Sequence, residues 1–173
     1  MNDLKKYNLC RDRIKTGDCI EFRTNSIVGW LIRKVTGKEE THTAKVIRFD
    51  LIDPDRIYLL EALDHGIELN LLSERLKKQN GNAWWVPLMP EFDNKRLLLG
   101  MYSLRWVGTP YDYFSIFKQL FNKVKINAKR FFCSEFANAV DIKAGLPVKK
   151  MKYAPRPGEM VDTGIYLDSI KIL

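Results

Sequence analysis

The sequence has few of the residues on which several common protein classes depend. Its 173 residues include three cysteines and two histidines, and no two cysteines form a Cys-x-x-Cys pair. These scarcities argue against a disulfide scaffold and against a zinc ribbon. The sequence also lacks a phosphate-cradling glycine loop and a Gly-x-Ser-x-Gly elbow, the motifs of P-loop nucleotide sites and of many serine hydrolases. We therefore expect neither a metal nor a cofactor.

Long apolar runs are absent as well. No stretch approaches the ~20 apolar residues that a membrane-spanning helix needs. The lysines near the N-terminus, Lys5 and Lys6, are not followed by the apolar segment of a secretory signal. The sequence therefore predicts a cytoplasmic protein without a transmembrane segment, and export by another route stays open.

Length and composition predict one globular domain over residues 1–173. Hydrophobic residues make up 46% of the chain, which is too high a share for a disordered protein. A chain of this length buries roughly 70% of the surface that it exposes when unfolded. We therefore expect a core that needs no disulfide to support it.

The charge of the chain is strongly unbalanced. Lys and Arg number 29 against 21 Asp and Glu, for a net charge of +8. This balance raises nucleic acid, an anionic membrane and an acidic polymer as candidate partners. Nine basic and two acidic residues lie between Lys118 and Lys152, so most of the surplus is local. A solvated helix face explains this segment, and the alternative is a positive potential around a reactive group.

Apolar periodicity and turn residues predict an α+β fold with a mostly antiparallel sheet, because strands cluster before the later helices instead of alternating with them. Ser26 and Gly37 are typical of the two ends of a helix whose apolar positions, Ile27, Trp30, Leu31 and Val35, indicate a core-facing side. Pro54 and Asp55 suggest a turn, and residues 165–172 suggest a short strand pair. The predicted strands cover 17–23, 41–49, 57–62, 67–71 and 83–88, and the predicted helices cover 27–36, 95–107, 114–124 and 131–144.

Cys133 is the best candidate for a nucleophile. It follows two phenylalanines at the expected start of a helix. The partial positive charge at a helix N-terminus favours a thiolate over a thiol. The alternative is an inert buried cysteine, which is the commoner fate of a free thiol. Cys19 is expected in the core, and Cys10 is expected at the surface.

Two further residues could complete a catalytic group with Cys133. His42 lies in a predicted strand whose alternation places it on a core-directed face with Ala44 and Val46. Glu61 ends an apolar run, where a carboxylate could orient an imidazole ring. A structural histidine and a strand-edge carboxylate are the alternatives. His65 is expected in a solvated turn.

Several segments together resemble one family, the circularly permuted branch of the NlpC-type papain-fold cysteine hydrolases. This branch is related to the lecithin retinol acyltransferase group, and the resemblance runs from about Gly17 to Gly158. The segments, in chain order, are Gly17-Asp18-Cys19-Ile20, residues 33–37, Thr41-His42-Thr43-Ala44-Lys45-Val46, Leu59-Leu60-Glu61-Ala62, Gly66-Ile67, Gly108-Thr109-Pro110-Tyr111-Asp112, Phe132-Cys133-Ser134-Glu135-Phe136 and Ala154-Pro155-Arg156-Pro157-Gly158.

The resemblance implies a papain-like fold, in which a curved antiparallel sheet packs against helices and the nucleophilic cysteine begins a helix. It implies that Cys133 is the nucleophile, His42 the general base and acid, and Glu61 the residue that orients His42. Tyr111 would line the substrate site. The family usually has glycine where this chain has Ala44, and this departure removes no catalytic group.

The resemblance also implies a cysteine peptidase or amidase acting on cell-wall peptides through a Cys133 thioester. Its substrate would be a small peptide or an acyl compound, with anionic cell-wall polymer as a further candidate partner and no nucleic acid. The first alternative is an acyltransferase or thioesterase acting on lipids. The second, from another class, is a non-catalytic basic module that binds an anionic polymer.

Overall fold

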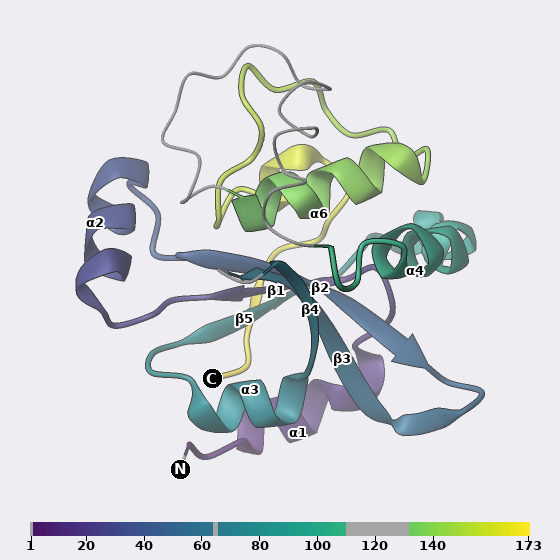
Figure 1. Cartoon of the computed structure of the whole chain (residues 1–173), viewed down its shortest axis with the longest axis horizontal. Helices are drawn as coiled ribbons and strands as arrows, with labels where there is room; N and C mark the ends of the chain where they lie inside the picture. Colours follow the sequence, from purple (N-terminus) through teal and green to yellow (C-terminus); the bar gives the residue numbers. More distant parts are fainter. Residues whose placement is uncertain (1, 64–65, 110–131) are drawn as a thin grey trace.

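A six-stranded antiparallel sheet forms the centre of the computed structural model, which describes residues 2–63, 66–109 and 132–173 (Figure 1). The strand order across the sheet is β4-β3-β2-β1-β5-β6, and every neighbouring pair runs antiparallel. The predicted α+β class with an antiparallel sheet is therefore confirmed. The strands are β1 (Cys19–Phe22), β2 (His42–Phe49), β3 (Asp53–Leu63), β4 (Gly66–Leu71), β5 (Ala83–Val86) and β6 (Ile170–Lys171).

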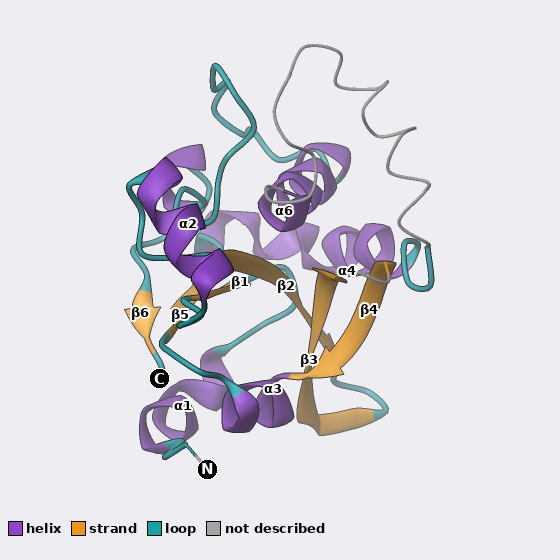
Figure 2. Cartoon of the chain, turned by 60° about the vertical axis from the view of Figure 1, so that its left-hand side comes forward, coloured by secondary structure: helices purple, strands orange, loops and turns teal. Residues whose placement is uncertain are grey.

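Helices cover both faces of this sheet. Helices α1 and α3 lie on one side, and α4 and α6 lie on the other, while α2 stands beside the sheet (Figures 1 and 2). Short 3₁₀ turns occur at Arg11–Arg13, Pro90–Lys95 and Val161–Thr163. The α-helices are α1 (Lys5–Cys10), α2 (Ile27–Thr36), α3 (Leu72–Lys78), α4 (Arg96–Leu104) and α6 (Phe132–Lys143). Within the described residues, no helix has the length and apolarity to cross a membrane.

Strand β1 shows how the two cores arise. Successive side chains of a strand point to opposite faces of the sheet. Cys19 packs into the cluster that contains residues of α4 and α6. Ile20 and Phe22 pack into the cluster on the side of α1 and α3. All four residues of β1 are buried, because both faces of the strand are covered.

Helix α2 has the expected ends but not the expected environment. The Ser26 side chain accepts a hydrogen bond from the Gly29 N–H, at 2.9 Å, and Gly37 ends the helix with a φ of 70°. Ile27 and Trp30, however, are 86% and 53% exposed. The prediction that these two residues face a core was wrong. Periodicity shows that a helix has an apolar side, but it does not show that another element covers that side.

Other differences concern segments with weak local signals. The turn predicted at Pro54 is wrong, because β3 already begins at Asp53 and the chain turns at residues 50–52. Helix α1 was not predicted, and it buries Cys10 to 3% exposure, so the surface placement of Cys10 was also wrong. Residues 165–172 form one short strand, β6, that pairs with β5. The predicted helix over 114–124 lies outside the described residues.

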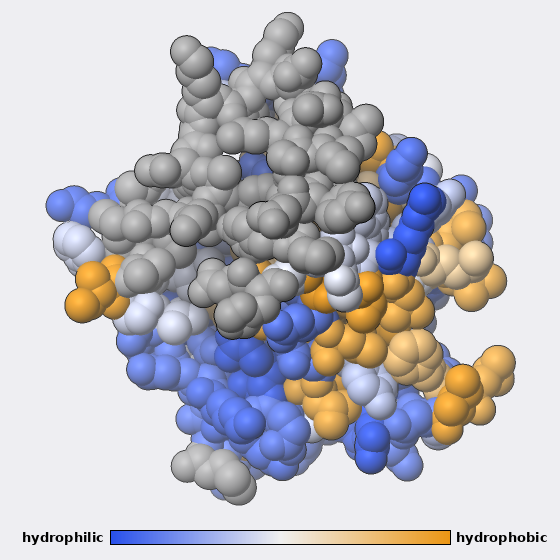
Figure 3. Space-filling view, viewed as in Figure 1, coloured by the Kyte–Doolittle hydropathy of each residue, from blue (hydrophilic) through white to orange (hydrophobic). Residues whose placement is uncertain are grey.

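One side of α4 is an exposed apolar surface. Leu97 and Met101 are 75% and 59% exposed. Hydrophobic side chains gather on the side of the molecule where Figure 1 places this helix (Figure 3). The opposite side of α4 contributes the buried Leu99 to the core that it shares with α6.

Candidate active site

Cys133 is the second residue of α6, where the helix crosses the sheet (Figure 1). Its side chain belongs to the buried stripe of the helix, with Phe136, Ala137 and Val140, and the residue is 6% exposed. The Sγ atom accepts a hydrogen bond from the backbone N–H of Thr43 in β2, at 3.3 Å. The thiol is therefore fixed at the start of β2 by a backbone donor.

His42 begins β2 and lies beside both other predicted catalytic residues. Its Nε2 atom is 3.0 Å from Oε1 of Glu61. Its ring stacks on Phe22, with ring centroids 6.0 Å apart. Burial alone would lower the pKa of His42, but the hydrogen bond and charge of Cys133, together with those of Glu61, raise this pKa to about 10. Because the pKa lies above neutrality, His42 favours the imidazolium form.

Glu61 lies in the middle of a set of donors. It is fully buried on β3 and accepts hydrogen bonds from His42, from Nδ2 of Asn70 at 3.2 Å and from Nε of Arg75 at 3.3 Å. Burial tends to raise the pKa of Glu61, but His42, Arg75 and Asn70 together lower it. The carboxylate is therefore ionised, and its oxygens hold the His42 ring in one orientation.

The structure thus brings together three of the four residues that the sequence singled out: Cys133, His42 and Glu61. Tyr111 and His65 lie outside the described residues. Sequence reasoning missed Asn70 and Arg75. Asn70 could have been found from the hairpin, because β4 pairs Asn70 with Leu59, two residues from Glu61. Arg75 lies on α3, a helix that the sequence did not reveal.

A buried carboxylate, Glu21, joins β1 to the loop that covers the start of α6. Its Oε1 atom accepts the Gly158 N–H at 2.9 Å, and the residue is 1% exposed. In the same loop the Pro155 carbonyl accepts a hydrogen bond from the Ser134 hydroxyl, at 2.6 Å. Burial raises the pKa of Glu21 to about 7, although backbone N–H groups of Gly158 and Met160 oppose the rise.

We expect Glu21 to make the protein less stable as the pH rises. Its pKa is about 7 when folded against an ordinary value of 4.5, so the folded chain binds its proton more tightly than the unfolded chain. The stabilisation is complete below pH ~4.5 and is lost as the pH rises through ~7, by roughly 3 kcal/mol in all. Glu21→Gln, which keeps an acceptor for the Gly158 N–H, should raise the melting temperature at pH 8 and change it little at pH 4.5. Equal effects at both pH values in thermal unfolding would contradict this linkage.

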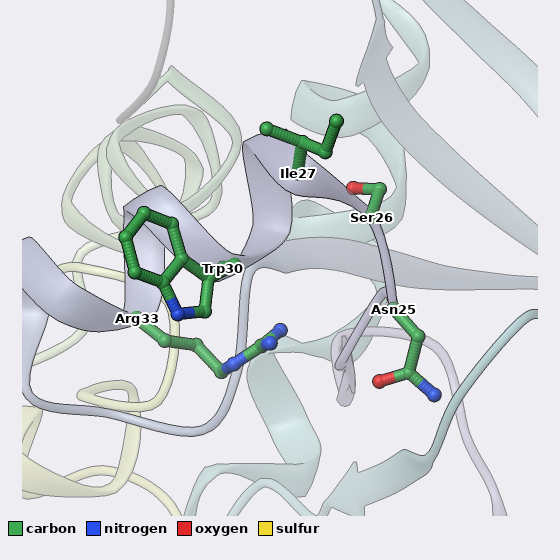
Figure 4. A pocket seen from close by; sticks show the side chains of 5 residues that line it. All are labelled: Asn25, Ser26, Ile27, Trp30 and Arg33. Carbon is green, nitrogen blue, oxygen red and sulfur yellow. The ribbon is translucent and has the colours of Figure 1, made fainter.

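A surface pocket of about 440 Å³ lies between the end of β1 and α2 (Figure 4). Trp30 and Arg33 of α2 line it, together with Ile27, Asn25 and Ser26. Two hydrogen bonds connect it to the start of β2. Nη1 of Arg33 donates to the Thr24 carbonyl at 3.0 Å, and the Thr24 N–H donates to Oγ1 of Thr41 at 3.0 Å. Thr41 precedes His42, so these two bonds link Arg33 in the pocket wall to the residue before His42.

No group of three or more His, Cys, Asp or Glu residues that could hold a metal ion occurs among residues 2–63, 66–109 and 132–173. The three cysteines are all free and buried. The chemistry that the described residues can offer at this site is therefore that of a thiol, an imidazole and a carboxylate.

Comparison with known proteins finds a similar fold but no match in sequence. No protein-family model matches the chain. No curated protein matches it. Among solved structures, the chain is similar to the crystal structure of metalloprotein yiiX from Escherichia coli O157:H7 (DUF1105), with a TM-score of 0.63 and 16% sequence identity. The similarity covers 90% of this chain and 96% of the other. At this identity it shows that the two proteins share an α+β fold over nearly their whole lengths.

Proposed function

We propose that the protein is a cysteine hydrolase of the circularly permuted NlpC type, with a papain-like fold and with Cys133 as its nucleophile. One observation supports this most directly: Nε2 of His42 lies 3.0 Å from the buried Glu61 carboxylate, and the next residue, Thr43, donates its backbone N–H to the Cys133 sulfur at 3.3 Å. A nucleophile, a base and a residue that orients the base form the arrangement that covalent acyl transfer requires. The position of Cys133 at the start of a helix is also that of the resembled family.

The proposed reaction has two steps. His42 holds its proton as an imidazolium beside the Cys133 sulfur, and the sulfur attacks the substrate carbonyl to form a C–S bond. The tetrahedral intermediate collapses when His42 gives this proton to the leaving amine, so that the C–N bond breaks and a thioester remains on Cys133. His42 then removes a proton from water, which attacks the thioester. The C–S bond then breaks, the acid product leaves, and His42 keeps the proton as the imidazolium that begins the next cycle.

Backbone N–H groups would stabilise the negative oxygen of this intermediate. Cys133 lies in the first turn of α6, where N–H groups have no acceptor within the helix. The helix dipole adds positive potential at the same place. Such preorganised donors contribute most when they point to charge that develops in the transition state. Tyr111 is proposed to line the substrate site.

The proposed substrate is an amide bond in a cell-wall peptide, with anionic cell-wall polymer as a candidate partner and the cytoplasm as the proposed location. The pocket between β1 and α2 favours a second candidate, an acyltransferase or thioesterase that acts on lipids. Ile27 and Trp30 present exposed apolar side chains at this pocket. An acyl chain could bury this surface, at about 25 cal/mol per Å².

A substrate screen distinguishes these functions. The purified protein is incubated with murein peptides and with acyl esters, and the Cys133→Ala variant serves as the control. We expect release of a new amine from the peptides by the wild-type protein and none by the variant. Cys133-dependent cleavage of esters alone would favour the lipid function. Binding of anionic polymer that is equal in both proteins, without turnover, would favour a non-catalytic module.

A further inference from the structure

A charged cluster is completely buried beneath α6, and it uses later residues of the same strand and helix that carry His42 and Cys133. Lys45 of β2 and Asp141 of α6 are both 0% exposed, and Nζ of Lys45 lies 2.6 Å from Oδ1 of Asp141. The same ammonium group donates to the Gly17 carbonyl at 3.0 Å and to the hydroxyl of Tyr166. That hydroxyl donates to Oδ2 of Asp141 at 2.8 Å. We call these residues, Lys45, Asp141 and Tyr166, the buried ion-pair cluster.

The cluster joins the same two elements as the contact between Cys133 and Thr43. Lys45 lies two residues after Thr43 on β2, and Asp141 lies eight residues after Cys133 on α6. Eight residues are about 2.2 turns, so Asp141 lies roughly 80° around the helix from Cys133, and both residues belong to its buried face. Two contacts separated along a helix fix both its position along the strand and its rotation.

Other contacts between α6 and the sheet are apolar and, unlike the hydrogen bonds of the cluster, do not depend on direction. Phe136, Ala137 and Val140 of α6 pack into the apolar core. Apolar burial is non-directional, and such a surface can shift with little loss. In the cluster, by contrast, all three protons of the ammonium group have an acceptor. Burial would lower the pKa of Lys45, but the charge of Asp141 raises it, so Lys45 favours its charged form.

A buried ion pair adds little to stability compared with an apolar replacement, but its geometry can specify one packing. We propose that the buried ion-pair cluster is a positioning device for the active site. It holds α6 on β2 in the one register that places the Cys133 thiol against His42. The proposal rests on the proposed function of Cys133. A displacement of about 1 Å at a reacting group can cost roughly 100-fold in rate, so a small shift of α6 is enough to matter.

The experiment separates positioning from stability. In Lys45→Met/Asp141→Leu/Tyr166→Phe all three polar side chains become apolar together, and we expect this variant to melt near the wild-type temperature. Lys45→Met alone leaves a buried carboxylate unpaired and should melt about 10 °C lower. We expect iodoacetamide to alkylate Cys133 of the folded triple variant about 10-fold more slowly than in the wild type. With a substrate in hand, kcat should fall while KM changes little.

Asp141→Asn keeps the shape of the side chain and provides a second test if the triple variant does not fold. It should slow the alkylation of Cys133 at least ~3-fold, and Asp141→Glu should not restore the rate, because the longer side chain displaces the helix. A wild-type rate in either the triple variant or Asp141→Asn, folded, would overturn the positioning role. A different result would count against the proposed function itself. Cys133 of the wild-type protein would then react with iodoacetamide no faster than a thiol of the unfolded chain.

Discussion

Replacing Cys133 by alanine should abolish turnover. In the proposed reaction this side chain supplies the atom that attacks the carbonyl, and no other thiol lies where it could substitute. Cys19 is fully buried in the core, where burial raises its pKa to about 12. Cys10 lies on α1, on the other side of the sheet. We expect kcat/KM to fall by ~10⁴-fold or more, as when other catalytic nucleophiles are removed. The measurement is the initial rate with the best substrate of the screen.

Cys10→Ala is the matched control for this variant. Cys10 is also buried, and its thiol donates to the carbonyl of Tyr7 at 3.3 Å. Its loss removes a buried thiol without touching the site, so turnover should stay at the wild-type level. Mass spectrometry after brief treatment with iodoacetamide should find the label on Cys133 in both the wild type and Cys10→Ala. Undiminished turnover in Cys133→Ala would reject the nucleophile assignment.

Local signals were enough to predict the elements that carry the three proposed catalytic residues. The helix of Cys133 was predicted from residue 131 to 144 and is observed at Phe132–Lys143. The strand of His42 was predicted from residue 41 to 49 and is observed at His42–Phe49. Both have strong periodicity, and Gly145 and Pro147 mark the end of the helix. Their meeting in space depends on sheet pairing, which a single sequence does not display.

The surroundings of the site were less predictable because they depend on burial. Lys45 alternates with apolar residues, a pattern typical of a solvent-facing position, yet it is fully buried. Its partner Asp141 is 96 residues away along the chain. Arg75 was missed because α3 is short and follows β4 directly, with no side-chain cap at its start. Pairs of buried charges that are far apart in the sequence cannot be predicted from the local pattern of apolar residues.

Glu61→Gln should reduce catalysis while leaving the fold intact. The replacement keeps the shape of the side chain and an oxygen for His42, but it removes the charge that helps to raise the pKa of His42. The positive charge of Arg75, 3.3 Å away, then remains without compensation. The pKa of His42 should therefore fall below its wild-type value of about 10. We expect kcat/KM near neutral pH to drop by roughly 100-fold.

The dependence of the rate on pH tests whether the charge of Glu61 causes this effect. The proposed reaction needs the proton of His42 for the leaving group, so activity should decline where His42 deprotonates. In the wild type we expect this alkaline limb near pH 10, and in Glu61→Gln it should move to lower pH. Glu68→Gln is the control, because Glu68 lies directly opposite Glu61 on β4, and it should shift neither the rate nor the limb. A Glu61→Gln enzyme with an unmoved limb would show that Glu61 does not act on His42 through its charge.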